Sequence, residues 1–475
     1  MGKNQNWSMS IAEELQQVAK RIKSGLGSIL AFFSTGCRSL QNSGIGAFAS
    51  GRYRNLFVEA GHSPQEVTAK TEAAFQQLFH GAPDTQAVCF PAGTNANGPL
   101  ACIHDIGSED VRSEGMSYGM MIAVQLNRKA EFDAIWNWAR TYMYHSLPNH
   151  PASGFFSWSV KINGTPNDKM PAPDGEEYFV TALYFAANRW GIGPGIYNYR
   201  AEADRLLTDM RHRALITGQT AKGPVTAGAL FEPEHKMVRF TPVIGNLNHT
   251  DPSYHLPAFY ELWALWGPAN DRAFWAEAAA ASRDFFQRAA HPVTGLTPDY
   301  ANFDGTPCAS DWNPHSADFR FDAWRTAMNW AVDWSWWGRD VRERQLSDRL
   351  QAFFESQGMS TYGNQFRLDG HQLSRDHSPG LVAMNAVAGL AATHPRSRQF
   401  VEALWKTPIP TGRHRYYDGL LYLLARLHCS GEFRIWTPQL PSKMPLQILR
   451  AKISAAWLWF ALVDCHGSAS GTGFG

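Results

Sequence analysis

The sequence predicts an all-α protein built as a closed, double-layered ring of about twelve helices. Stretches with helical periodicity follow one another along most of the chain, and short breaks such as Gly267-Pro268 join many of them into antiparallel pairs. Two stretches, 116–126 and 380–392, are almost free of polar residues. A helix without a polar face has to be surrounded by protein, so we expect an inner layer of helices covered by an outer one.

The first helix has the clearest start signal. Ser63 is a good N-cap residue, Pro64 suits the first helical position and Glu66 completes a capping box, which predicts a helix to about His80. Eleven further helices are expected at 113–126, 130–146, 175–190, 198–213, 254–266, 270–289, 322–337, 340–356, 379–393, 396–405 and 416–430.

Four long stretches between these helices are rich in turn-forming residues, and we expect them to be loops: 81–112, 147–173, 214–253 and 291–321. Some alternation over 225–241 is compatible with a short hairpin. Long loops in a compact chain are usually functional, so the site is expected where they meet the helices.

The ends of the chain differ from its middle. We expect a leader over 1–45, disordered or signal-like, a catalytic domain over 46–436 and a tail over 437–475. An apolar run at 25–33 follows a basic stretch, as in a secretion signal, but Glu13 and Glu14 are untypical of one. The predicted location is therefore cytoplasmic, with export as the alternative. The apolar run at 453–463 is too short to span a membrane, and no membrane association is expected.

The composition excludes several classes of function. Lys and Arg total 43 against 42 Asp and Glu, so the net charge of +1 offers no field for a nucleic acid. Aromatic residues reach 13%, which suits a neutral, hydroxyl-rich or apolar ligand. The six cysteines are scattered, and the serine-hydrolase, phosphate-loop, dinucleotide and metal-site motifs are all missing. These absences argue against a serine hydrolase, a phosphotransferase and a dehydrogenase, and no metal or other cofactor is expected.

Glu114 and Asp322 are the carboxylates best placed for acid–base chemistry. Glu114 directly precedes an apolar run, where desolvation raises a carboxyl pKa as a general acid requires. The alternative is a first-turn residue favoured by the helix dipole. Asp322 lies among aromatic residues between Arg320 and Arg325, which suits an ionised base that activates water; the alternative is a salt-bridged helix start.

Three more residues are candidates with a structural alternative each. Asp174 is expected to be an N-cap that forms a capping-box-like pair with Glu177, although such a residue can also face a ligand. Tyr254 stands at a loop-to-helix junction and either holds a water or sugar hydroxyl or belongs to the core. Trp158, in a loop rich in small residues, is the tryptophan expected to stack on a ligand; the alternative is a core residue, as for the other aromatic runs.

Six motifs in order resemble glycoside hydrolase family 8 and, within it, the reducing-end xylose-releasing exo-oligoxylanases. They are SEGMSYGM at 113–120, APDGEEYFVTA at 172–182, DPSYHLP at 251–257, FDAWR at 321–325, HSPGLVAMN at 377–385 and RYYDGLL at 415–421. The resemblance covers about 46–436. It implies an (α/α)6 barrel and an inverting, metal-independent glycosidase acting on β-1,4-xylooligosaccharides.

The resemblance also implies roles for individual residues. Glu114 corresponds to the general acid, Asp322 to the general base, Asp174 to the aspartate that holds the distorted sugar, Tyr254 to the tyrosine beside the attacking water, and Arg325 would orient the base. Inversion requires the two catalytic carboxyls to lie roughly 6.5–9.5 Å apart.

His377 corresponds by the same resemblance to the histidine of a loop that closes the cleft beyond the reducing-end sugar. An open loop would instead give an endo-acting xylanase, cellulase or chitosanase. A third possibility is a carbohydrate-binding protein on an inactive scaffold. The oligomeric state stays open.

Overall fold

The computed structural model describes residues 44–220, 223–245 and 249–438. The predicted leader and tail therefore lie almost wholly outside the described residues. Across the described ranges, the structure contains no helix that is both long and apolar enough to cross a membrane.

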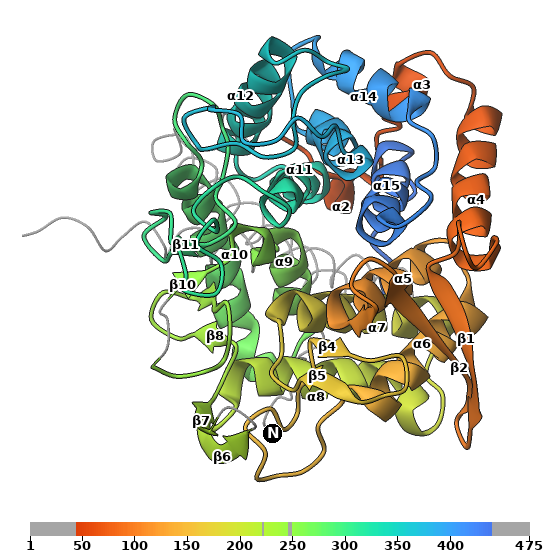
Figure 1. The fold of residues 1–475 in the computed structure, drawn as a ribbon, viewed down its shortest axis with the longest axis vertical. Coiled ribbons are helices and arrows are strands. Elements are labelled where there is room, and N and C mark those ends of the chain that lie inside the picture. Colours follow the sequence, from red (N-terminus) through yellow and green to blue (C-terminus); the bar gives the residue numbers. More distant parts are fainter. Residues whose placement is uncertain (1–43, 221–222, 246–248, 439–475) are drawn as a thin grey trace, which may run out of the picture.

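Six inner helices form the ring, and each packs against its neighbours around it (Figure 1). They are α5 (Ser113–Gln125), α7 (Pro173–Trp190), α9 (Pro257–Trp266), α11 (Thr326–Trp337), α13 (Pro379–Val387) and α15 (Arg415–Cys429). Helices α7 and α9 contact each other through side chains, for example where the Tyr260 hydroxyl donates to Glu177, and through the short 3₁₀ turn η3 (Pro252–Tyr254). Helix α15 returns to α5, which closes the ring.

Six outer helices alternate with the inner ones along the chain and cover them. They are α4 (Pro64–His80), α6 (Lys129–Tyr142), α8 (Tyr199–His212), α10 (Arg272–Ala289), α12 (Arg342–Ser356) and α14 (Ser397–Lys406). In Figure 1, α11, α13 and α15 lie inside α12, α14 and α4. The prediction of an (α/α)6 barrel is confirmed by this arrangement within the described residues.

Burial explains which helices are inner. In α5 every residue except Glu114 is buried, and in α13 every residue except Pro379. The outer helix α4 buries only one stripe, which includes Val67, Phe75 and Leu78. The two nearly apolar stretches of the sequence therefore form inner helices, as predicted.

The helix starts follow the sequence signals in part. Ser63 and Glu66 form the expected capping box at α4, with Ser63 Oγ 3.2 Å from the Glu66 amide. Two short helices that periodicity did not reveal precede it, α2 (Ala47–Ser50) and α3 (Leu56–Glu59). Three predicted helices begin or end as 3₁₀ turns, η3 before α9, η5 (Ala323–Arg325) before α11 and η6 (Ala388–Leu390) after α13. Two further 3₁₀ turns precede outer helices, η2 (Gly195–Tyr197) before α8 and η4 (Ala269–Asp271) before α10.

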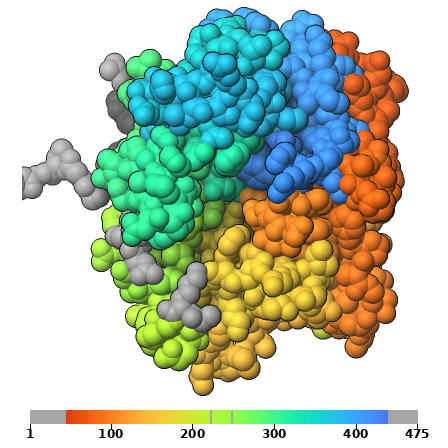
Figure 2. Space-filling view, viewed as in Figure 1, coloured from red at the N-terminus to blue at the C-terminus, as the bar shows by residue number. Residues whose placement is uncertain are grey.

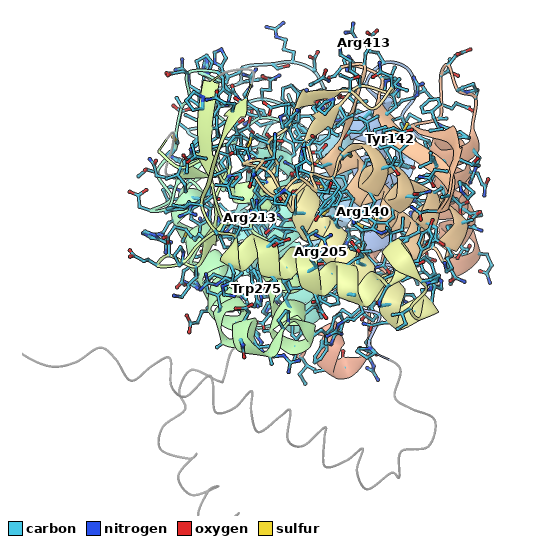
Figure 3. All side chains as sticks on the ribbon, turned by 90° about the horizontal axis from the view of Figure 1, so that it is seen from below. Arg140, Tyr142, Arg205, Arg213, Trp275 and Arg413 are labelled. Carbon is cyan, nitrogen blue, oxygen red and sulfur yellow. The ribbon has the colours of Figure 1, made fainter. Side chains whose placement is uncertain are left out.

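Ion pairs link neighbouring outer helices. Arg140 of α6 and Arg205 of α8 both contact Glu202, at 3.4 and 2.9 Å. Figure 3 shows these two arginines close together where α8 crosses the front of the molecule. The outer layer is thus tied together by charge as well as by packing.

The prediction that 81–112 and 147–173 are loops was wrong in part. They contain a five-stranded antiparallel sheet in the order β1 (Cys89–Asn95), β2 (Gly98–Asp105), β3 (Asp110–Arg112), β4 (Ser159–Val160) and β5 (Pro166–Asp168). Prolines and glycines interrupt the apolar pattern of β1 and β2, and β4 and β5 are too short to show alternation. Pairing between β3 and β4, which are distant in the chain, stabilises these strands instead.

Three two-stranded pairs lie in the other predicted loops. The hairpin expected in 225–241 is present as β8 (Phe231–Glu232) with β9 (Met237–Val238). The alternating residues before it belong to β7 (Gly223–Ala227), which pairs back with β6 (Ile216–Thr220). The third pair joins two predicted loops, β10 (His249–Thr250) with β11 (Ala301–Asn302).

Candidate active site

The candidate site lies where the inner helices begin. Glu114 is the second residue of α5, Asp174 the second residue of α7, and Asp322 directly precedes η5, whose last residue is Arg325. Because each inner helix is followed by an outer one that returns, the inner helices run in one direction and their first turns share one end of the barrel.

One guanidinium holds the three carboxylates. Arg325 Nη1 donates to Glu114 Oε2 and to Asp174 Oδ2, both at 2.7 Å, and Arg325 Nη2 donates to Asp322 Oδ1 at 2.8 Å. The Tyr118 hydroxyl lies 2.8 Å from the same Nη1. Arg325 is 1% exposed, so its contacts with Glu114 and Asp174 lie away from solvent screening, and its three contacts fix the relative positions of the carboxyl groups.

Glu114 is in the state that a general acid needs. Burial raises its pKa to about 7, although the positive charge of Arg325 acts in the opposite direction. Its second oxygen, Oε1, accepts a hydrogen bond from the Tyr416 hydroxyl at 3.0 Å. A carboxyl with this pKa is mostly protonated below pH 7 and about half protonated at pH 7.

Asp322 is more open to solvent than the other two carboxylates. Its side chain is 34% exposed, whereas those of Glu114 and Asp174 are 14% and 5% exposed. Arg325 contacts it as expected, but Arg320 bonds to Gln365 instead. Asp322 is therefore a carboxylate that has access to water and contacts one cationic side chain, that of Arg325.

The contacts limit how far apart the acid and base candidates lie. The terminal nitrogens of one planar guanidinium are covalently fixed, so the contacted oxygens of Glu114 and Asp322 are at most about 8 Å apart. Arg325 separates the two groups, and they do not bond to each other. This bound is compatible with the roughly 6.5–9.5 Å of an inverting glycosidase.

The prediction that Asp174 is the N-cap of its helix, paired with Glu177 in a capping box, was wrong. The N-cap is Ala172, because Pro173 occupies the first position and starts the helix earlier. Asp174 Oδ1 accepts from the Gly175 amide at 2.9 Å, and Glu177 bonds to a tyrosine of α9. Burial raises the Asp174 pKa.

Two buried aspartates behind Asp322 were missed by the sequence reasoning. Asp299 accepts from the Ala323 amide at 3.0 Å and so holds η5, while Asp251 caps the turn η3 through the Ser253 amide at 2.7 Å. Burial and the negative charge of Asp322 raise the pKa of both. Asp251 lies inside a motif quoted above, whereas Asp299 carries no sequence signal.

A cavity of about 700 Å³ opens onto the acid and base candidates. Glu114 and Asp322 line it together with Trp324, Tyr417 and Arg413. In Figure 2 the segments that line the cavity are coloured orange (105–114), teal to light blue (321–378) and blue (413–418), and Figure 3 shows Arg413 at the upper edge of the molecule. Its size falls within the usual range of ligand pockets.

The remaining candidates lie at different distances from this centre. Tyr254 is buried, and its ring centroid lies 5.9 Å from the Arg325 guanidinium. The cavity lining does not include Asp174, Tyr254, Trp158 or His377. The Arg112 guanidinium lies 5.6 Å from the Trp158 ring, and His377 Nδ1 lies 2.9 Å from the Tyr362 carbonyl oxygen.

The described residues contain no group of three or more His, Cys, Asp and Glu side chains arranged to hold a metal ion. The centre of the carboxylate cluster is instead a guanidinium. That the enzyme needs no metal or cofactor stays a prediction.

Comparisons with known proteins agree on one family. Residues 97–431 match the family model described as "Glycosyl hydrolases family 8". The chain is 43% identical to the reducing-end xylose-releasing exo-oligoxylanase Rex8A of Paenibacillus barcinonensis, over 83% of this chain and 99% of that protein. It is 41% identical to the exo-oligoxylanase of Halalkalibacterium halodurans, over 83% of this chain and 97% of that protein.

Solved structures of similar chains include sugar complexes. A family 8 xylanase from Teredinibacter turnerae, a catalytic mutant in complex with xylohexaose, is 59% identical with a TM-score of 0.82, covering 83% of this chain and all of that chain. Rex8A complexed with xylose is 42% identical with a TM-score of 0.76, covering 82% of this chain and all of that chain.

Proposed function

The chain belongs to glycosyl hydrolase family 8, and from this premise we propose that it is an inverting enzyme that releases xylose from the reducing end of β-1,4-xylooligosaccharides. The observation that carries the chemistry is the pair Glu114 and Asp322, held apart by one guanidinium at a cavity. The relatives named for this exo-activity supply the substrate class.

Glu114 is proposed as the general acid. It gives its proton to the glycosidic oxygen while the bond from that oxygen to C1 breaks, and the bonding electron pair stays on the oxygen. A pKa of about 7 supports this role, because the proton is present at neutral pH and still acidic enough to be transferred.

Asp322 is proposed as the general base. It accepts a proton from a water molecule that attacks C1 on the face opposite the leaving oxygen, which inverts the anomeric configuration. Arg325 orients the Asp322 carboxylate through its Nη2 contact. Tyr254 is proposed to stand beside the attacking water and Asp174 to hold the distorted sugar, since both lie against Arg325.

Trp158 and His377 are proposed as substrate contacts at the margin of the site. The Trp158 carbonyl accepts from the Ser113 amide at 3.0 Å, which places this residue at the start of α5. His377 stands between Asp376 and Ser378, both of which line the cavity. It is proposed to limit the cleft beyond the reducing-end sugar.

A second candidate is an endo-acting xylanase with the same chemistry. The Teredinibacter turnerae protein, at 59% identity, is described only as a xylanase in complex with xylohexaose, without the exo-activity named for the relatives cited above. The His377 side chain also stays outside the cavity lining. Endo-action requires a cleft that stays open beyond the reducing-end sugar.

Chromatography of digests separates the two candidates. The exo-enzyme should release xylose from xylotriose and xylotetraose and spare reduced xylotetraose. Early mixed oligomers from polymeric xylan would favour endo-action instead. Proton NMR of fresh xylotriose digests should show the new reducing end first in the α configuration; a first product in the β configuration would exclude inversion.

The acid and base assignments have their own test. Glu114→Gln and Asp322→Asn should each lower kcat by about 10²–10⁴-fold. Glu59→Gln, which removes an exposed carboxylate paired with Arg54, is the control and should leave kcat unchanged. Full activity in either site variant would contradict the mechanism and would favour an unidentified catalytic group.

The domain limits and the location are also proposals. The catalytic domain is proposed to span 46–436, of which the family model matches 97–431. A cytoplasmic location is proposed because of the two glutamates before the N-terminal apolar run, with export as the alternative. Cell fractionation, with N-terminal sequencing of the mature protein, tests this: a cleaved leader would contradict the cytoplasmic location.

A further inference from the structure

Oxygen Oε1 of Glu114 is held by a group that the mechanism above does not use. Tyr416, the second residue of α15, donates its hydroxyl to Oε1 at 3.0 Å, while Arg325 donates to Oε2 at 2.7 Å. Tyr416 is 2% exposed and also lines the cavity. Donors on both oxygens fix the plane of the carboxyl group, not only its position.

The residue after Glu114 leaves space for this phenol. A Cβ atom on Gly115 would lie 2.4 Å from Tyr416 Cε2 and 2.5 Å from its hydroxyl oxygen. Glycine destabilises a helix relative to alanine, and Gly115 lies within the first turn of α5. The close approach of the Tyr416 ring gives a physical reason for a glycine at this position.

We propose that Tyr416 is a positioning residue for the proton donor Glu114, and that Gly115 is the glycine that lets the phenol reach the carboxyl group. This inference rests on the proposed function, in which Glu114 is the general acid. The hydroxyl keeps the Glu114 carboxyl group in one rotamer beside the cavity. After the proton has been transferred, the same hydroxyl stabilises the carboxylate that remains.

The hydrogen bond also has an electrostatic consequence with a definite sign. Burial raises the pKa of Glu114 to about 7. A hydroxyl that donates to Oε1 favours the charged carboxylate and therefore acts against burial. Removing the hydroxyl should raise the pKa of Glu114 further, so the acid would keep its proton to higher pH.

Other titratable or charged groups also face Glu114, and the test leaves all of them in place. These groups are Arg112 of β3, Tyr118 of α5, Asp174 and Tyr178 of α7, Asp322 before η5, Arg325 of η5 and Tyr417 of α15.

The test compares the pH dependence of kcat/KM on xylotriose for the wild type, Tyr416→Phe and Gly115→Ala. The alkaline limb of kcat/KM reports the acid of the free enzyme. It should move upward by about one pH unit in Tyr416→Phe, the shift expected when a carboxylate loses one hydrogen bond. Gly115→Ala should move it in the same direction, because the new methyl group displaces the phenol.

Two matched variants control for packing. Gly119→Ala crowds the same helix, since its Cβ would lie 2.8 Å from Ile103 Cγ1, and Tyr422→Phe removes another buried hydroxyl from α15. Both should leave the limb in place. If the alkaline limb of the kcat/KM profile stays in place in Tyr416→Phe, the proposed role of Tyr416 is wrong. If the limb moves as far in Gly119→Ala as in Gly115→Ala, the proposed role of Gly115 is wrong.

Failure of the inference can be told apart from failure of the proposed function. Difference infrared spectroscopy can follow the titration of the Glu114 carboxyl group, whose band is identified by its absence in Glu114→Gln. The pH midpoint of this titration should be higher in Tyr416→Phe than in the wild type, whether or not the proposed substrate is correct. If this midpoint stays unchanged, Tyr416 does not position Glu114. Full activity of Glu114→Gln would refute the catalytic role itself.

Discussion

Replacing Arg325 by methionine tests the centre of the site most directly. Methionine preserves much of the side-chain volume but removes every N–H donor. The change leaves Glu114 and Asp174 buried without their shared cation. Breaking a buried ion pair by removing one partner costs about 3–5 kcal/mol, so the free energy of unfolding should fall by about that amount near pH 8.

The loss should depend on pH with a definite sign. Burial already raises the pKa of Glu114 and Asp174, and losing the positive charge of Arg325 raises both further. In the variant these carboxyls bind protons more tightly in the folded state than in the unfolded chain. Its stability is therefore highest at acidic pH and falls as the pH rises towards the folded pKa values. The deficit relative to wild type should be smaller at pH 5 than at pH 8.

Urea unfolding at pH 5 and pH 8, together with xylotriose hydrolysis, measures both effects. Activity should fall by about 10²–10⁴-fold, because Asp322 loses the group that orients it. Arg283→Met is the matched control, since Arg283 is a buried arginine that holds Asp333 at 2.6 Å and Glu261 at 2.8 Å outside the cavity. It should lose similar stability and keep its activity per folded molecule.

Two results would contradict this reasoning. One is an Arg325→Met variant within about 1 kcal/mol of wild-type stability at pH 8, since a buried pair should be worth more. The other is an Arg283→Met variant that loses as much activity as Arg325→Met, because the effect on catalysis would then follow from destabilisation alone.

Two further predictions concern the acid and the first helix. In the wild type, kcat/KM should decline on the alkaline side with a midpoint at about pH 7, because Glu114 must be protonated and its pKa is about 7. A kcat/KM profile that stays flat up to about pH 9 would contradict Glu114 as the general acid. Ser63→Ala should lower the free energy of unfolding by about 1 kcal/mol without changing kcat, because it removes the capping box of α4 far from the cavity; unfolding in urea measures the loss, and an unchanged midpoint would contradict the role of the cap.

The helices were predictable because their signals are local. Periodicity located all twelve barrel helices, and the capping box placed the start of α4. The short strands were not predictable, because β3 and β4 owe their structure to each other and not to their own residues. The error at Asp174 was local, because Pro173 starts the helix earlier than predicted, but the bond of its carboxyl group to Arg325 of another segment was not predictable from local signals.

For the site, a sequence pattern shows which residues stand at helix starts but not which of them meet. Tyr416 lies in a quoted motif that gave it no role, and Asp299 lies in a predicted loop; the roles of both follow only from the segments that the ring brings beside Glu114 and η5.

The amino-acid sequence by itself determined that the chain forms a ring of paired helices, because backbone hydrogen bonding and the burial of an apolar face are decided within each helix. The geometry of the candidate site, in contrast, was decided by the closure of the ring. It directs the first turns of α5 and α7 and the residues around η5 towards one buried guanidinium, and low solvent access there turns an ordinary glutamate into an acid with a pKa of about 7.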